Sequence, residues 1–369
     1  MNDGWHREYT LKFAIAKMSL NTTTMNTILT PQQILSNIIS LTTSKKLIVA
    51  FSGGMDSHVL LDLVVKTKVL SPDYQVSALH VHHGISPNAD EWAEHCETIC
   101  KELEIPCTVL WVDGSVKDGG SPEEMAREAR FEAFENFLQP HECLLMAHHE
   151  ADQAETILLR LFRGTGPLGL GGIPEKAKVG QSELIRPLLH IPKDALLQYA
   201  SENHLQWIED ESNTNTRFDR NFLRHEILPT LYARWPRVLR SVNRSGALCL
   251  ETATAVQVLA LKDLEMVLSK NANNSKETHN SKNAQNTETF ETLSVSKLLG
   301  LDPVRRKGVI RCWLQRLGFA LPSRSHMERI DREVLNAKPG SKPRLKISEY
   351  EIKRIKDELS VGLYSHTMV

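Results

Sequence analysis

The first half of the chain alternates short apolar runs with longer segments of helical period. The apolar runs have the length of buried strands and lie at 47–51, 76–82, 107–112 and 144–147. Between them, apolar residues recur three or four positions apart and predict helices at 88–103, 121–138 and 151–162. Strands that alternate with helices predict an α/β fold with a doubly wound parallel sheet, whose ligands bind at the carboxyl ends of the strands.

The pattern changes after residue 163. Six glycines between 164 and 180 predict a mobile loop, followed by a short edge strand at 184–189 and a helix at 192–203. From about 222 the pattern is helical, with runs near 302–318 and 325–336, and the polar segment 270–290 predicts a disordered insert. We therefore predict a flexible extension (1–30), an α/β domain (31–228) and a second, all-helical domain (229–369) that carries the insert.

Composition argues against a membrane protein. No stretch approaches the roughly 18 consecutive apolar residues that span a bilayer, and the N-terminus lacks a small-residue cleavage site. Six cysteines without regular spacing indicate reduced thiols in a cytoplasmic protein. Cys96 and Cys100 are four residues apart, which favours buried helix thiols over a metal site.

Arginine is concentrated in part of the second half, although the net charge of the chain is only −1. Seven arginines lie between residues 217 and 244, against two acidic residues. This balance predicts a polyanionic partner such as nucleic acid, with a solvated helix face as the alternative. Arg127 and Arg130 share a predicted helix face, where they could neutralise phosphate or form an exposed salt-bridge ladder.

A glycine loop follows the first apolar run. Ser52, Gly53 and Gly54 separate that run from Asp56, Ser57 and the next apolar segment, which is the order strand, tight loop, helix. Glycine permits positive φ and a close approach of backbone to a ligand, and the first helical amides with the serine hydroxyls would bind phosphate. No lysine follows the glycines, so this is not a GxxxxGK[ST] loop. A carboxylate beside phosphates is explained by a bridging Mg²⁺.

Other polar residues follow the predicted strands. His82 and His148 stand just after strand runs, as Ser52 does, so the three are expected to share one cleft. Asp152 and Glu155 are three residues apart at a helix start and share one face. Two carboxylates there could hold Mg²⁺ or a substrate ammonium group, or could simply complement the helix dipole.

The SGGxDS loop resembles the pyrophosphate loop (PP-loop) of the N-type ATP pyrophosphatases, which implies an adenine nucleotide alpha hydrolase-like fold. Further motifs, in order, resemble bacterial tRNA(Ile)-lysidine synthetases. They lie at 51–57, 80–85, 124–131, 147–156, 163–172, 186–189 and 210–224. The RGTG…GLGG loop and the DESN…RN..R run are the segments specific to this family. The resemblance covers about 47–229 and continues, more weakly, to about 358.

This resemblance implies a ligase that forms a C–N bond on tRNA(Ile) with a CAU anticodon. ATP would adenylate the C2 oxygen of the wobble cytidine (position 34) and release pyrophosphate. The ε-amine of free L-lysine would then attack C2 and expel AMP, which gives lysidine and changes codon reading from AUG to AUA. The attacking amine must be neutral, so a local base or a desolvated pocket is required.

The resemblance also implies roles for individual residues. ATP would be bound by Ser52, Gly53, Gly54, Met55, Asp56, Ser57, His82 and His148. Mg²⁺ would be held by Asp56, and the substrate lysine by Asp152 and Glu155. Arg127 and Arg130 would stabilise phosphates or position the tRNA. The tRNA backbone would be contacted by Arg217, Arg220, Arg224 and Arg237.

The chain departs from the family pattern in two ways. Ala151 stands where the family has the first of two acids, and the family's far C-terminal domain is expected to be largely absent.

A tRNA thiolase of the same superfamily is one alternative function, although it would need catalytic cysteines, commonly as C-x-x-C. A tRNA-binding protein with a decayed ATP site is another. The sequence leaves the oligomeric state open, a homodimer included.

Overall fold

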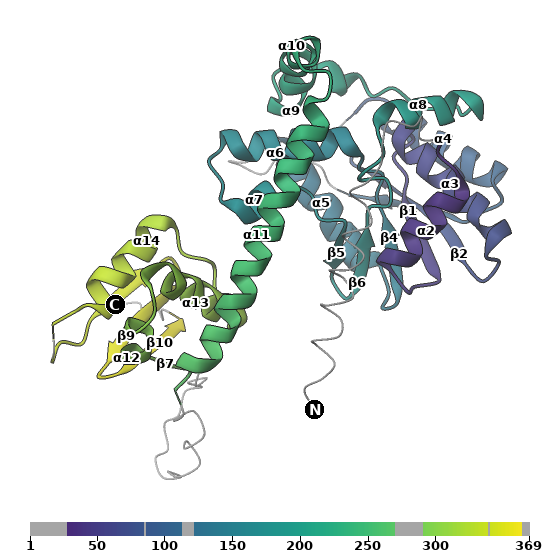
Figure 1. Ribbon diagram of the computed structural model, residues 1–369. Coiled ribbons are helices and arrows are strands. Elements are labelled where there is room, and N and C mark those ends of the chain that lie inside the picture. The colour runs from purple at the N-terminus through teal and green to yellow at the C-terminus, as the bar shows by residue number, and fades with distance from the viewer. Residues whose placement is uncertain (1–27, 85, 113–121, 270–290, 339, 364–369) are drawn as a thin grey trace. The chain divides into compact units, whose positions relative to one another are not determined.

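The computed structural model describes residues 28–84, 86–112, 122–269, 291–338 and 340–363 (Figure 1). The chain divides into two compact units, Met1–Ala247 and Leu248–Val369. The predicted N-terminal extension (except 28–30) and the predicted insert at 270–290 lie outside the described residues. No helix in the described part is long and apolar enough to cross a membrane.

A six-stranded sheet forms the centre of the first unit, in the order β3-β2-β1-β4-β6-β5. Its strands are β1 (Lys46–Ala50), β2 (Gln75–His82), β3 (Cys107–Trp111), β4 (Glu142–Leu145), β5 (Lys176–Val179) and β6 (Ser182–Ile185). The pairings are parallel except that of β5 with β6. The predicted α/β fold with a doubly wound parallel sheet is confirmed. Strand order reverses between β1 and β4, so their carboxyl ends border the crevice where such folds bind ligands.

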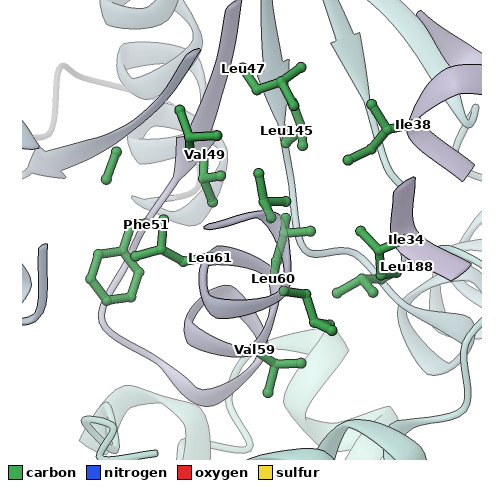
Figure 2. Packing of buried hydrophobic residues seen from close by; sticks show 14 of the residues in the cluster. Ile34, Ile38, Leu47, Val49, Phe51, Val59, Leu60, Leu61, Leu145 and Leu188 are labelled. Carbon is green, nitrogen blue, oxygen red and sulfur yellow. The ribbon is translucent and has the colours of Figure 1, made fainter. Parts of the chain in front are cut away.

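Helices cover both faces of this sheet. They are α2 (Pro31–Leu41), α3 (Met55–Leu70), α4 (Ala89–Glu102), α5 (Pro122–Phe137), α6 (Glu150–Phe162) and α8 (Lys193–Glu202). Ile34 and Leu60, on α2 and α3, pack against Val49 of β1 in one core (Figure 2). Phe134 of α5 packs against Ile48 in a second core. Successive β1 residues therefore enter different cores, which explains why this strand is apolar throughout.

Two details of the predicted first domain are wrong. The segment predicted as a loop at 164–180 contains α7 (Pro167–Leu170) and β5. The strand predicted at the sheet edge is β6, which lies between β4 and β5. Only Val179 of β5 is buried, so this short edge strand has no apolar run by which the sequence could reveal it.

Short helices and one long helix end the first unit. They are α9 (Asp219–Phe222), η2 (Leu223–Ile227), α10 (Leu228–Arg234) and α11 (Val238–Val267). Leu223, Leu228 and Leu239 pack against Leu158 of α6, which binds this segment to the α/β unit. For this reason the division between the units falls inside α11, at 247/248, rather than at 228.

The second unit combines helices with a sheet, so the prediction of an all-helical domain is wrong. Its helices after α11 are α12 (Val295–Leu299), α13 (Pro303–Arg316), α14 (Arg324–Arg329) and η4 (Ile330–Leu335). Its antiparallel strands, in the order β7-β10-β9-β8, are β7 (Leu293–Ser294), β8 (Arg344–Ile347), β9 (Tyr350–Ile355) and β10 (Glu358–Leu363). Buried Leu345, Ile347 and Ile352 alternate with polar residues, the two-residue period of a half-buried sheet.

Candidate active site

The glycine loop connects β1 to α3. Ser57 Oγ donates to Gly54 O (2.9 Å), accepts from Ser52 N (3.2 Å) and lies 3.0 Å from Ser52 Oγ, so the two serines brace the turn. Gly54 is the N-cap of α3 and has no side chain with which to cap it. The first amides of this helix are therefore uncapped by side chains, and the helix dipole adds positive potential at the same point.

Gly53 has φ +82°, a conformation that side chains with a Cβ rarely adopt. A Cβ there would lie 2.9 Å from Ile208 Cδ1 and 3.2 Å from Cys96 Sγ. We expect Gly53→Ala to cost about 1–2 kcal/mol of stability through backbone strain and to lower ATP affinity sharply, because the loop must shift.

Gly180→Ala is the matched control for Gly53→Ala. Gly180 also has positive φ (+56°), but it lies in the β5–β6 hairpin. Thermal unfolding should report a similar loss of stability in both variants, whereas equilibrium ATP binding should fall only in Gly53→Ala. Equal ATP affinity in the two variants would contradict the assignment of this loop to phosphate.

Asp56 lies in the first turn of α3 with one oxygen unsatisfied. Among the described residues its buried Oδ1 has no hydrogen-bond partner, and its Oδ2 lies 3.4 Å from His149 Nε2. A buried carboxylate oxygen without a partner is costly unless a cation is present for part of the cycle. Within the described ranges no cluster of three His, Cys, Asp or Glu side chains could hold a metal by itself. One carboxylate with phosphates and water completing the shell is an arrangement that suits Mg²⁺.

The turn from β4 to α6 contacts this loop through His149. His149 Nδ1 accepts from Ala151 N (3.2 Å), and Asp152 Oδ2 accepts from His149 N (2.9 Å), which together form a capping box. Because Nδ1 is an acceptor, the hydrogen is on Nε2. That nitrogen lies 3.4 Å from Asp56 Oδ2 and 3.5 Å from Asp152 Oδ2. His149 therefore links the predicted metal ligand to a predicted lysine ligand, a role that the sequence analysis missed.

Two carboxylates of α6 form a compact charge cluster with two arginines. Glu155, which is 1% exposed, receives two hydrogen bonds from Arg224 and one from Arg220, each 2.8 Å long. Arg220 also donates to Asp152 Oδ1 (2.8 Å). Burial alone would raise the pKa of Asp152, but His149 and Arg220 hold it below its usual value. Burial opposes the charge of Arg224, yet its bonds to Glu155 raise its pKa.

A cavity of about 550 Å³ opens beside this cluster. Glu155 and Arg224 contribute to its wall, and the remaining charged lining comes from His149, Glu150, Lys193, Asp194, Arg237 and Arg240. Burial raises the pKa of Glu150, and Arg240 opposes that rise. The cavity therefore offers both acidic and basic groups, which is what the ammonium and carboxylate groups of a free amino acid require.

Comparison with known proteins places this site in a family. Residues 25–231 match the PP-loop domain family, and residues 293–360 match the TilS substrate binding domain. The tRNA(Ile)-lysidine synthase of Coxiella burnetii (strain RSA 493 / Nine Mile phase I) is 40% identical over 327 residues, which are 89% of this chain and 68% of that protein. The chain belongs to the tRNA(Ile)-lysidine synthase family. The resemblance inferred from the motifs is thereby confirmed.

One further relative agrees with this family, and one solved structure agrees with the fold. The tRNA(Ile)-lysidine synthase of Enterobacter sp. (strain 638) is 40% identical over 326 residues, 88% of this chain and 72% of that protein. Among solved structures, the U34-tRNA thiolase NcsA from Methanococcus maripaludis with its 4Fe–4S cluster aligns with a TM-score of 0.50 and 19% identity. That alignment covers 60% of this chain and 78% of the thiolase, and it supports the fold alone.

The structure brings some of the predicted residues of this tRNA(Ile)-lysidine synthase family member together. Asp56 approaches Asp152 through His149, and Arg220 and Arg224, which were predicted to contact tRNA, pair with Asp152 and Glu155. Because those contacts depend on the packing of α9 and η2 against α6, no local sequence signal could reveal them.

The other predicted residues have contacts of their own. His82 Nε2 lies 2.9 Å from Asp90 Oδ1, and its ring centroid is 3.9 Å from that of Trp111. His148 Nδ1 accepts from Arg186 Nε (3.2 Å). The remaining arginines are exposed Arg127, half-buried Arg130, exposed Arg217 and the cavity-lining Arg237.

Proposed function

We propose that this chain joins L-lysine to C2 of the wobble cytidine (position 34) of CAU-anticodon tRNA(Ile), with ATP as the activating substrate. The observation that carries the proposal is the His149 bridge. Through it, the phosphate-binding loop with its unsatisfied Asp56 oxygen lies next to the carboxylates of α6. A nucleotide-activating group and an ammonium-binding group are thus adjacent, as a two-step ligation requires.

In the first step, the cytidine O2 attacks the α-phosphate of ATP, and the bond to pyrophosphate breaks. The uncapped amides of α3, with Ser52 and Ser57, would hold the phosphates. Asp56 would hold Mg²⁺, which supplies charge stabilisation for the departing pyrophosphate. This step turns a poor leaving oxygen on C2 into a good one.

In the second step, the lysine ε-amine attacks C2, loses a proton and displaces AMP. We assign the lysine to the 550 Å³ cavity, with its ammonium groups facing the acidic lining of Glu155, Glu150 and Asp194. Asp152 does not line the cavity and would act through Arg220, which it shares with Glu155. Arg237 and Arg240 are suitably charged for its α-carboxylate. The carboxylates of α6 are already neutralised by Arg220 and Arg224, so an incoming ammonium group must share or displace an arginine contact.

We further propose that Arg217, an exposed arginine of the predicted set, contacts tRNA phosphates. The match of 293–360 to a substrate binding domain supports a tRNA contact by the second unit as well.

A thiolase is disfavoured by the state of the cysteines. Cys96 lies behind Gly53 and is the thiol nearest the loop, but burial raises its pKa, so little thiolate is available. Cys100 is also buried, as the helix spacing predicted. The decayed-site alternative rested on Ala151 and on the expected lack of the far C-terminal domain. The first ground is weakened, because the backbone amide of Ala151 takes part in the His149 cap whatever its side chain.

The function is tested by incubating the full chain with radiolabelled lysine, ATP, Mg²⁺ and a CAU-anticodon tRNA(Ile) transcript. We expect label in the tRNA, with AMP and pyrophosphate formed in equal amounts, and none in a transcript that carries uridine at position 34. Absence of label from a folded protein that still binds ATP would overturn the proposal.

A further inference from the structure

Arg186 is a buried arginine that follows β6 and that the reaction described above does not use. It is 4% exposed. Its Nη1 donates to Pro174 O (2.7 Å), and its backbone amide donates to Glu175 O (2.9 Å). These bonds fix the guanidinium, whose Nε then donates to His148 Nδ1 (3.2 Å). No carboxylate in the described part of the chain pairs with this guanidinium, which is unusual for a buried arginine because its charge must be balanced elsewhere.

The bond from Arg186 determines where His148 carries its hydrogen. An imidazole nitrogen that accepts a hydrogen bond is unprotonated, so the neutral ring carries its hydrogen on Nε2. A second proton on Nδ1 would meet the guanidinium N–H and could not be accommodated in this geometry.

The surrounding charges oppose protonation in the same way. Burial lowers the pKa of His148 most, Asp152 opposes that effect, and the cations Arg186, Arg220 and Arg127 lower it further, to about 3. The ring stays neutral throughout the physiological range, although it is only half-buried and stands at the end of β4 beside the capping residue His149.

We propose that Arg186 is a positioning residue that holds His148 as a neutral ring with its Nε2–H available to donate to an oxygen of the bound nucleotide. This inference rests on the assignment of the β1–β4 crevice to ATP. A neutral donor has a specific advantage here. It stabilises a phosphate oxygen by hydrogen bonding, yet it adds no positive charge that would repel the ammonium group of the incoming lysine.

Nuclear magnetic resonance of the full chain tests the first half of the proposal without any assay of activity. With ¹⁵N-labelled histidine, and His148→Gln to assign the signal, we expect Nδ1 of His148 to show the shift of an acceptor nitrogen at pH 7. In Arg186→Met, both ring nitrogens should move towards a mixture of tautomers, and the titration should shift to higher pH. An Nδ1–H tautomer or an imidazolium in the wild type would overturn the proposal.

A pH profile of ATP-dependent pyrophosphate release tests the second half. Because the pKa of His148 is about 3, the wild type should show no acid limb from this ring near neutral pH, whereas Arg186→Met should raise that pKa and move the acid limb of kcat/KM for ATP to higher pH. A rise of half a pKa unit corresponds to about threefold less neutral ring on that limb. Adding His148→Gln to Arg186→Met should abolish the move, because glutamine keeps an N–H donor and does not titrate. Arg186→Lys, which keeps the positive charge, should move the limb less than Arg186→Met.

The possible outcomes separate the two proposals. If Arg186→Met loses melting temperature and activity equally at every pH, Arg186 is only structural and this inference fails. If the wild type shows the expected tautomer but releases no pyrophosphate with tRNA, the ligase assignment fails while the effect of Arg186 on His148 remains.

Discussion

Replacing Asp56 with asparagine is expected to lower ATP-dependent pyrophosphate release by at least about a hundredfold to a thousandfold. The carboxylate is the one that faces the phosphate loop, and its buried Oδ1 has no partner in the described part of the chain. Asparagine keeps the shape of the aspartate side chain but not its charge, so it cannot hold Mg²⁺ in place beside two phosphates. Single-turnover pyrophosphate release from ATP and tRNA, measured across a Mg²⁺ titration, would show a lost or strongly weakened metal dependence.

Asp73→Asn is a suitable control for this experiment. Asp73 is 58% exposed and pairs with Lys45 at the opposite end of β1 from the loop. It should leave pyrophosphate release unchanged, since exposed ion pairs contribute little. Asp56→Asn itself should not unfold the protein, because asparagine has the same size, the side chain is 33% exposed, and the one ion-pair contact that the structure describes for it, with His149, is 3.4 Å long. Full activity of Asp56→Asn with an unchanged Mg²⁺ dependence would refute the metal assignment.

Local sequence patterns predicted those parts of the fold that have a local cause. The strand β1 could be predicted because it is buried on both faces and is therefore an apolar run. The loop after it could be predicted because its glycines give backbone freedom and its serines suit phosphate binding. The polar edge strand β5 could not be predicted, because its stability comes from pairing with β6 rather than from its own sequence pattern. The strands β8 and β9 do alternate, but the helical pattern that precedes them in the sequence was extended to the end of the chain.

The same distinction applies to the site. The residue types at the strand ends predicted which side chains of the site are charged or polar. Because these residues follow successive strands of one parallel sheet, the sequence also predicted that several of them would lie in the same cleft. The partners of those charges come from elements far away in sequence. Glu155 and Arg224 are 69 positions apart, and His148 and Arg186 are 38 apart. Sequence could therefore predict an arginine-rich segment near nucleic acid, but not that two of its arginines turn inward to neutralise α6.

Because α6 is neutralised in this way, Glu155→Gln is expected to affect stability and lysine transfer together. The substitution leaves Arg224 and Arg220 with one buried carboxylate fewer, and breaking such a buried pair costs about 3–5 kcal/mol. Transfer of lysine to the adenylated tRNA should fall by at least about tenfold through a weaker lysine contact, whereas adenylation should fall much less. Urea unfolding gives the first quantity, and rapid-quench assays of pyrophosphate release and lysine incorporation give the other two.

A compensating variant separates the structural role of Glu155 from lysine binding. Adding Arg224→Gln to Glu155→Gln removes both members of the best-bonded pair, so the local charge is balanced again and much of the lost stability should return. Lysine transfer should stay low, because the carboxylate that faces the cavity is still missing. If the double variant regains lysine transfer along with stability, Glu155 only balances Arg224, and the lysine must be recognised by the remaining acidic groups of the cavity, Glu150 and Asp194.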